Sequence, residues 1–419
     1  MTAARARVFY GWWVTAAFSV MVFASTGVRH AVGPFLKPMV ADLHVDRASF
    51  SLVIALGLFL YGVFMPLVGG LVDRVGARAV TAGGAIVLAG SLALTGVCRT
   101  IWDLALVYGV LAAVGLAATG PVVANAVVSR WFVARRGTAV SVLGSASMTG
   151  MSLLVPVVTW LILSLGWRMT YLAIALFVLV GILPLCLLVV RDSPESMGLC
   201  PDGAPEGPGG RAGRAERTPV GTAAHTVAFW QLSGSFLTCG FSMSLLSAHG
   251  IPMLTDHGYT PLFSSWVLGV LGASSILFTM LLGTASDHFG RRPVLAAIYA
   301  GRALAFAGLF LIRDNPAAIL AVAVFGGTTT AGTMSMTSAL TADIYGRFSV
   351  GTILGAIFLM HQTGAAIGSW LAGALFEVTG GYGVAYAIAC AILVGAALVS
   401  LRIDDGRRRL SWTARAARA

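Results

Sequence analysis

The sequence predicts an all-α integral membrane protein with twelve transmembrane helices in two similar halves. Of its 419 residues, 58% are hydrophobic and only 10% are charged, whereas a soluble globular chain carries about 25% charged residues. Apolar runs of about 20 residues, long enough to cross a bilayer as a helix, recur along the chain. A pattern of residues in the first half also recurs in the second. Together these observations predict a polytopic protein embedded in a lipid bilayer.

The net charge of +11 does not predict nucleic acid as a partner, because the basic residues are scattered through short loops between apolar runs. The five cysteines form no C-x-x-C pair and indicate neither a disulfide framework nor a metal site. No sequence feature calls for a cofactor. The first apolar run is longer than a signal-peptide core and has no small-residue cleavage pattern, so it is interpreted as the first retained helix.

The expected helices divide into six plus six around one long polar stretch, which is rich in proline, glycine and arginine and resembles a flexible linker. The predicted domains are a six-helix bundle at 1–190, a cytoplasmic linker at 191–226, a second bundle at 227–402 and a cytoplasmic tail at 403–419. The helices are expected at 10–33, 49–71, 79–98, 103–128, 138–164, 169–190, 229–251, 262–282, 293–312, 317–341, 350–376 and 382–401.

The distribution of basic residues predicts the orientation in the membrane. If the N-terminus lies inside, 20 of the 27 basic residues fall in inside segments, five fall outside, and Arg29 and Arg302 remain in apolar runs. Because lysine and arginine accumulate in cytoplasmic loops, both termini are predicted to be cytoplasmic. A bacterial inner membrane is the expected location, and a monomer is the default oligomeric state.

An internal repeat with an offset of 214 residues is the sharpest signal in the sequence. Gly69-x3-Asp73-Arg74-x-Gly76-x-Arg78 follows the second expected helix, and Gly283-x3-Asp287-His288-x-Gly290-Arg291-Arg292 follows the eighth. Gly137-Thr138 and Gly351-Thr352 open the fifth and eleventh helices, and Gly166 and Gly380 precede the sixth and twelfth. Six helices separate the repeats, so the two copies are predicted to be parallel.

The segment Gly69 to Arg78 resembles the loop signature of the major facilitator superfamily. Within that superfamily, further segments resemble the monocarboxylate transporter and oxalate:formate antiporter branch. They are Tyr10-Gly11-Trp12-Trp13-Val14, Arg130-Trp131-Phe132 with Arg135-Arg136-Gly137, Asp192 to Leu199 with Pro201-Asp202-Gly203, and His249 with Asp256 and Gly258.

The resemblance implies two six-helix bundles around a central cavity, which rock about a site near the midplane. It also implies that the loop signature closes the cytoplasmic gate. Asp73 can pair with a neighbouring arginine and face the N-terminal dipole of the eleventh helix; the alternative is that these charges anchor the helix ends. The expected gating residues are Asp73, Arg74, Arg78, Arg130, Asp287 and Arg291.

Ionisable side chains inside the expected helices are candidates for substrate contact, because a charge in the hydrocarbon is costly. Those found are Arg29 and His30 on the first helix, Arg302 on the ninth and His361 on the eleventh, and no acid lies clearly inside a helix. Such a basic cavity favours an anion. The oxalate:formate branch has a lysine near the position of His361, and the monocarboxylate branch has a basic residue near His30. Arg29 can instead snorkel, and Arg302 can serve a structural network.

Four polar residues complete the expected substrate site. Ser147 is the repeat partner of His361, Gln362 lies beside His361, and Asn125 and Tyr61 lie on other cavity helices. Side chains of this kind in membrane helices also serve helix packing.

The predicted function is secondary active transport of a small organic anion, a mono- or dicarboxylate, by proton symport or anion exchange. The monocarboxylate branch has an aspartate and an arginine on its eighth helix, and neither occurs in Ser274-Ser275-Ile276-Leu277-Phe278. Transport of neutral solutes or drugs and a non-transporting membrane sensor stay open as alternatives. An enzyme is not expected, since no H-E-x-x-H or G-x-S-x-G motif is present.

Overall fold

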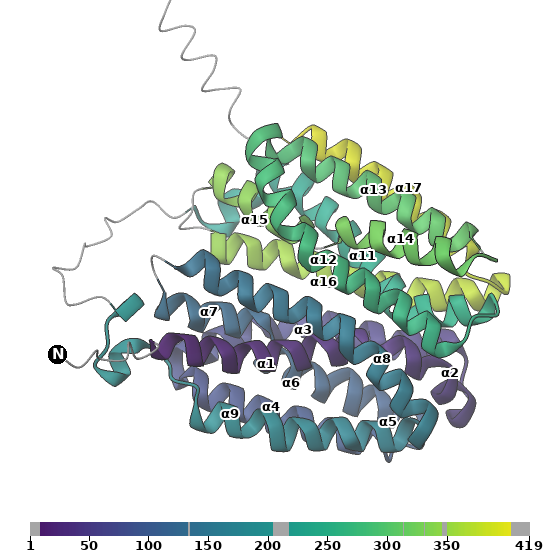
Figure 1. The fold of residues 1–419 in the computed structure, drawn as a ribbon, viewed down its shortest axis with the longest axis horizontal. Coiled ribbons are helices and arrows are strands. Elements are labelled where there is room, and N and C mark those ends of the chain that lie inside the picture. Colours follow the sequence, from purple (N-terminus) through teal and green to yellow (C-terminus); the bar gives the residue numbers. More distant parts are fainter. Residues whose placement is uncertain are drawn as a thin grey trace, which may run out of the picture. The chain divides into compact units, whose positions relative to one another are not determined.

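The computed structural model describes residues 9–132, 135–203, 218–312, 314–330, 332–345 and 350–403. Within these ranges the chain is almost entirely helical and contains no strand (Figure 1). The first half comprises α1 (Tyr10–His30), α2 (Val32–Leu43), α3 (Arg47–Val75), α4 (Ala77–Thr95), α5 (Ile101–Leu104), η1 (Ala105–Ala112), α6 (Ala113–Thr119), α7 (Pro121–Trp131), α8 (Arg136–Phe177), η2 (Val178–Ile182) and α9 (Leu183–Leu188).

The linker region contains three short elements, η3 (Pro194–Met197), η4 (Pro201–Gly203) and α10 (Val220–Ala224). The second half comprises α11 (Val227–Asp256), α12 (Pro261–Phe289), α13 (Arg291–Leu311), α14 (Pro316–Thr328), α15 (Gly332–Tyr345), α16 (Val350–Thr379) and α17 (Gly383–Leu401).

The predicted membrane fold with twelve spanning helices is confirmed. Ten described segments are long and apolar enough to cross a bilayer. One of them, Thr138–Leu188, has 51 residues, more than twice the length that one crossing needs, and it bends at Gly166 (φ 80°) into two helices. The 30-residue helix α16 supplies the twelfth.

Three expected helices are interrupted in the structure. The first ends at His30, and α2 begins two residues later. The helix expected at 103–128 is broken at Gly120, where Pro121 starts α7 with a ring that already has a helical φ. The helix expected at 317–341 consists of α14 and α15 with a break at Thr329 and Thr330. In each case hydrophobicity predicted the span but not the change of direction inside it.

Large apolar side chains are exposed along the helices, as a lipid-facing surface requires. Leu67 on α3 is 62% exposed, Leu188 on α9 is 70% exposed and Leu277 on α12 is 71% exposed. Exposing these apolar side chains to water would be unfavourable, whereas in a bilayer they contact the hydrocarbon of the lipids.

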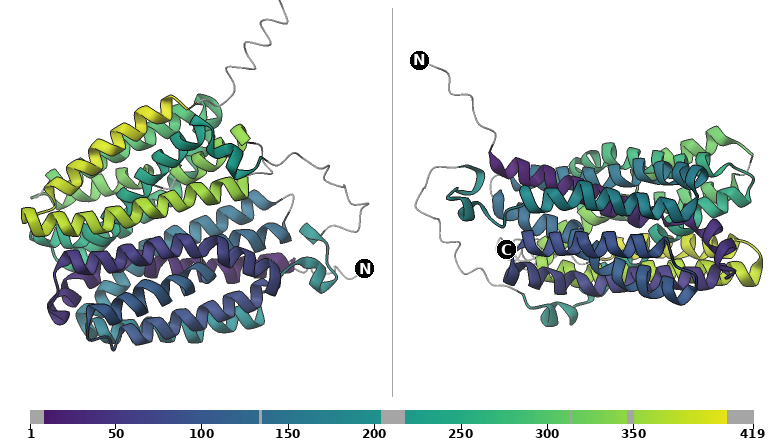
Figure 2. Two further views of the ribbon diagram at one scale, coloured as in Figure 1. Left: turned by 180° about the vertical axis from the view of Figure 1, so that it is seen from behind. Right: turned by 90° about the horizontal axis from the view of Figure 1, so that it is seen from below.

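The contacts group the chain into two compact units. Unit 1 contains Met1–Phe35 and Val63–Arg211, and unit 2 contains Leu36–Gly62 and Ala212–Ala419. Within each unit the long helices run alongside one another (Figure 2). The segment 36–62, which holds most of α2 and the first half of α3, therefore packs with the helices of the second half of the sequence.

The 214-residue repeat extends to the closest helix contacts in each unit. In unit 1, α1 and α8 meet where a side-chain carbon added to Gly150 would strike the carbonyl of Phe23. In unit 2, α11 and α16 meet where the same carbon on Gly364 would strike the carbonyl of Leu237. Both residues of the second pair lie 214 positions after those of the first.

A second contact pair repeats in the same way, with the glycine on the other helix. Gly27 of α1 lies against Leu154 of α8, and Gly368 of α16 lies against Phe241 of α11. Phe241 and Gly368 lie 214 positions after Gly27 and Leu154, respectively. The two units are therefore built on equivalent helix pairs. The turn glycines also repeat, because Gly76 (φ 95°) and Gly290 (φ 87°) have the same left-handed backbone before α4 and α13.

Candidate functional site: polar groups buried in two helical units

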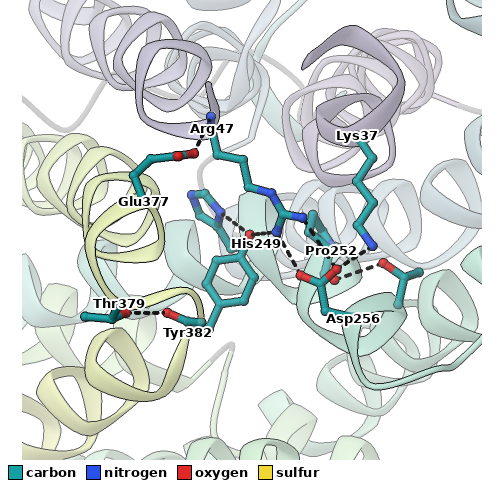
Figure 3. Close-up of polar contacts among 10 residues, drawn as sticks. Lys37, Arg47, His249, Pro252, Asp256, Glu377, Thr379 and Tyr382 are labelled. Atoms are coloured by element: carbon teal, nitrogen blue, oxygen red, sulfur yellow. Dashed lines mark hydrogen bonds and ion pairs between the residues drawn. The ribbon is translucent and has the colours of Figure 1, made fainter. Parts of the chain in front are cut away.

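Four helices of unit 2 contribute charged side chains to one cluster at the start of α3 (Figure 3). Arg47, the first residue of α3, donates from Nη1 to Asp256 Oδ2 at 2.8 Å and from Nη2 to Oδ1 at 3.4 Å. Lys37 of α2 pairs with Asp256 Oδ1 at 2.6 Å. On α16, the Glu377 carboxylate accepts from the backbone N–H of Arg47 at 2.9 Å, so an acid caps the N-terminus of α3. We name Lys37, Arg47, His249, Asp256, Glu377 and Tyr382 the Arg47 cluster.

His249 of α11 lies fully buried beneath the ion pairs. Its Nε2 is 2.9 Å from the carbonyl of Ser369 and 3.3 Å from the hydroxyl of Ser51. Its Nδ1 is 3.3 Å from the Tyr382 hydroxyl, which in turn accepts a hydrogen bond from Arg47 Nη1 at 2.8 Å. The histidine is therefore linked to the ion pairs through a single phenol.

Arg302 of α13 is 1% exposed and lies inside unit 2. Its Nη2 donates to the carbonyls of Thr329 at 2.6 Å and Thr330 at 2.8 Å, and its Nη1 donates to Cys239 Sγ at 3.1 Å. These carbonyls lie at the break between α14 and α15, where the helix leaves them without regular partners. The guanidinium thus stabilises a broken helix at membrane depth.

The 214-residue repeat has no charged residue at the position equivalent to Arg302. The positions 214 residues earlier than Arg302 and Thr329 are Leu88 and Gly115, which also contact each other, in unit 1. An apolar contact in the first half is therefore replaced by a charged one in the second.

His361 is part-buried in the middle of α16. Its Nδ1 is 2.9 Å from Oε1 of the fully buried Gln362, so Nδ1 carries the proton and donates to this oxygen. The ring stacks on Phe358 at 5.2 Å and lies 4.6 Å from the ring of Phe236. His361 also interacts with the Cys239 thiol, which joins it to Arg302.

Arg29, His30 and Ser147 lie in unit 1. The buried His30 donates from Nδ1 to the carbonyl of Thr26 at 2.9 Å, and Ser147 of α8 donates to the hydroxyl of Thr26 at 3.1 Å. Arg29 is half-buried and close enough to Tyr108 for an electrostatic interaction. In unit 1, hydrogen bonds between polar side chains therefore connect α1 and α8.

Asn125 and Tyr61 lie on different elements. Asn125 is on α7 in unit 1, and its buried Oδ1 has no hydrogen-bond partner among the described residues. Tyr61 is on the part of α3 that belongs to unit 2 and is 4% exposed. An amide oxygen that is buried and unbonded is available to a bound molecule.

The side chains of two expected gating residues, Asp73 and Asp287, lie outside the described part of the structure. Arg74 and Arg78 are exposed at the end of α3 and the start of α4, and Arg130 is half-buried at the end of α7. Arg291 donates to Asp343 at 2.8 Å and to the carbonyl of Ala339 at 2.6 Å, so it ties the start of α13 to α15.

An acid that we did not predict caps α4. The Asp192 carboxylate accepts from the backbone N–H groups of Ala77 and Arg78, the latter at 3.1 Å. In the sequence Asp192 was noted only within a segment typical of the monocarboxylate branch. Its place at a helix N-terminus gives that segment a structural role in unit 1.

The structure thus joins His361, Gln362 and Arg302 in unit 2, and places Arg29, His30, Ser147 and Asn125 in unit 1. The Arg47 cluster was not predicted, because Lys37 and Arg47 fall between the helices expected at 10–33 and 49–71, and His249 stands out in the sequence only through its resemblance to the monocarboxylate branch. The signal that could have found it is a histidine within an apolar run, two helical turns before an acid.

A chain of twelve apolar helices with a parallel repeat and buried polar groups in each unit defines a multi-pass membrane transporter. It belongs to the Major Facilitator Superfamily, whose family model matches residues 18–260 and 232–418. The superfamily predicted from the loop signature is therefore confirmed. Its substrate is a small molecule that crosses the bilayer.

Relatives in bacteria and mammals align over nearly the whole chain. It is 25% identical to the uncharacterized MFS-type transporter YcxA of Bacillus subtilis (strain 168) over 413 residues, 93% of each chain. It is 24% identical to monocarboxylate transporter 13 of Rattus norvegicus over 404 residues, which cover 92% of this chain and 87% of the relative.

Solved structures share the fold at lower sequence identity. The D-xylose-proton symporter superimposes with a TM-score of 0.73 and 15% identity, covering 94% of this chain and 98% of the symporter. The nucleoside transporter NupG superimposes with a TM-score of 0.72 and 15% identity, covering 93% and 99%. Identities this low establish the fold alone.

Proposed function

We propose that the protein is a secondary active transporter of a small organic anion, a mono- or dicarboxylate. It works by alternating access between two six-helix bundles, 1–190 and 227–402, by proton symport or anion exchange. The observation that carries the proposal is the charge inside the helices. Arg302 is buried in unit 2 and has no carboxylate partner in the described part of the chain. Each described ion pair, in contrast, has an acid at the end of a helix.

Arg302 is a buried cation with which an anionic substrate can interact. Its guanidinium is joined through Cys239 to His361, whose Nε2 can donate to a carboxylate once it is protonated. Because a buried cation favours a negative ligand, Arg302 supports an anionic substrate. The likeness to monocarboxylate transporter 13 supports the same class of substrate.

Replacing His361 tests this proposal. In proteoliposomes, His361→Ala should reduce exchange of a labelled carboxylate about tenfold or more, because a charged hydrogen bond contributes roughly 1.5–3 kcal/mol. The matched control is His225→Ala, which removes an exposed histidine at the end of α10 and should leave exchange unchanged. Full exchange by correctly folded His361→Ala would remove His361 from the substrate site.

The class of substrate is tested separately by a thermal-shift screen of carboxylates, sugars and amines against the purified protein. A ligand that binds only the folded state raises its unfolding temperature. Stabilisation by carboxylates supports the proposal, whereas stabilisation by sugars or amines alone would replace it with a neutral-solute or drug transporter.

The proposed orientation has both termini, the 191–226 linker and the 403–419 tail in the cytoplasm of a bacterial cell, with the protein in the inner membrane as a monomer. The basic residues support it. In this orientation Asp73, Arg74, Arg78, Arg130, Asp287 and Arg291 belong to the cytoplasmic gate, and the Arg47 cluster lies at the outer face.

A further inference from the structure

The Arg47 cluster connects two segments that are far apart in the sequence. Lys37 and Arg47 belong to the first six-helix half, whereas Asp256, Glu377 and Tyr382 belong to the second. Under alternating access the two halves must separate at the outer face before a substrate can enter. Every bond of the cluster between these segments must then break, so the cluster acts as a latch.

The hydrogen bonds fix which nitrogen of His249 carries a proton. Nε2 lies 2.9 Å from the carbonyl of Ser369, which only accepts, so Nε2 must donate. The Tyr382 oxygen already accepts from Arg47 at 2.8 Å, and its own proton has Nδ1 of His249 as an acceptor at 3.3 Å. The closed latch therefore contains a neutral imidazole with an unprotonated Nδ1.

The phenol stays a donor over the whole physiological range. Burial raises the pKa of Tyr382 to about 12, so its proton remains in place near neutral pH. Of the two side chains, the imidazole of His249 and not the phenol of Tyr382 is therefore the one that can take up a proton as the pH falls.

A proton on Nδ1 would oppose the closed arrangement in two ways. The Tyr382 hydroxyl could no longer donate to that nitrogen, and a second cation would lie beside the Arg47 guanidinium in a fully buried position. The charged and titratable groups that the described contacts bring to this site are Arg47 from α3, Lys37 from α2, Asp256 from α11, Glu377 from α16 and Tyr382 before α17. Both acids are already bonded to Arg47, and neither contacts His249 in the described contacts.

We propose that His249 is the proton-sensitive switch of an acid-released outer latch. The neutral imidazole holds the Arg47 cluster closed, and protonation of Nδ1 releases α3 from α11 and α17. The inference rests on one part of the proposed function, namely that the outer face of the protein opens during transport. A transporter with this device would open outward more often when the medium is acidic.

The experiment measures the latch without any substrate. Spin labels are placed at Ala41 on α2 and Leu262 on α12, both of which are exposed, in the full-length protein with its native cysteines replaced. Distances between the labels are then recorded by pulsed electron resonance from pH 7.5 to pH 5.5. The separated population should grow about tenfold in the otherwise unchanged protein, because the imidazole is reached by solvent and has the ordinary histidine pKa only in the open state, whereas the closed arrangement disfavours the proton.

The decisive variant is His249→Gln. A glutamine can donate to the Ser369 carbonyl and accept from Tyr382, but it cannot take up a proton. We expect the distances in this variant to stay at the closed value at every pH. His257→Gln, which changes another histidine at the end of α11, should keep the full pH response and serves as the matched control.

Two further variants test the latch itself. Tyr382→Phe removes the donor to Nδ1, and Asp256→Asn weakens the ion pairs, so both should separate the labels even at pH 7.5. A pH response retained by His249→Gln would overturn the assignment of the switch, and unchanged distances in Asp256→Asn would overturn the latch. Neither outcome depends on which solute is transported, so failure of the anion proposal is recognised separately in the exchange assay.

Discussion

Arg302 illustrates how one side chain replaces regular backbone hydrogen bonds inside a membrane. Its planar guanidinium donates from Nη2 to two carbonyls and from Nη1 to a thiol. A carbonyl without a partner in the hydrocarbon costs several kcal/mol, so the break between α14 and α15 depends on this residue. At the equivalent place in unit 1, Leu88 performs no such role.

Arg302→Lys should therefore lower the thermal stability of the purified protein by several degrees. A lysine carries its donors on one nitrogen, whereas Arg302 bonds its acceptors from two separate nitrogens, and each lost charged hydrogen bond costs roughly 1.5–3 kcal/mol. Tryptophan fluorescence during heating in detergent measures the unfolding midpoint. Arg99→Lys, at an exposed position, is the control, and equal midpoints for the two variants would contradict the bracing role.

The sequence could identify Arg302 as unusual but not what it binds. A charge in an apolar run is visible by inspection, and so were Arg29, His30 and His361. The target of Arg302 is a helix break 27 and 28 residues further along, and nothing in a run of small residues and threonines specifies where a helix will break. The hydrogen bonds of Asn125, Ser147 and Gln362 depend in the same way on helix rotation.

At the level of helices, glycine determines which pairs approach most closely. Gly240, Gly364 and Gly368 all lie where α11 and α16 pack, and no side chain would fit at these places. Small residues allow membrane helices to pack closely when hydrophobic forces cannot join them. The repeat of such contacts at an offset of 214 explains why landmarks in the loops predicted equivalent helices correctly.

Gly364→Ala should destabilise the protein by roughly 1–3 kcal/mol, because the added methyl group collides with the carbonyl of Leu237. Gly355→Ala, on the same helix but with open space around it, should be neutral or stabilising by about 0.5–1 kcal/mol. The two unfolding midpoints can be measured side by side. If Gly364→Ala were as stable as Gly355→Ala, α11 and α16 would not pack as described.

For the whole molecule, the count of helices and the parallel repeat were predictable because they follow from hydrophobic length and from a spacing that is repeated within one chain. The assignment of residues 36–62 to unit 2 was not, because the ion pairs of Arg47 join residues more than 200 positions apart. Sequence patterns report on local periodicity, whereas such contacts arise only when the helices are packed.

The predicted orientation can be tested by labelling single cysteines in intact cells. In a protein without native cysteines, Val97→Cys should react with an impermeant maleimide, because residue 97 is 60% exposed and follows the end of α4 that is expected to face the outside. Met197→Cys, 42% exposed in the linker region, should react only after the membrane is permeabilised. The reverse pattern would mean that the termini are outside.

The Arg302 network also has a consequence for biosynthesis. An arginine near the centre of a helix raises the cost of insertion by the translocon by about 2.5–3.5 kcal/mol. The carbonyls that accept from it lie 27 and 28 residues later in the chain, and a ribosome adds that length within a few seconds at about 5–20 residues per second. We therefore expect α13 to enter the bilayer together with α14 as a hairpin, since only then does its buried charge meet the groups that satisfy it.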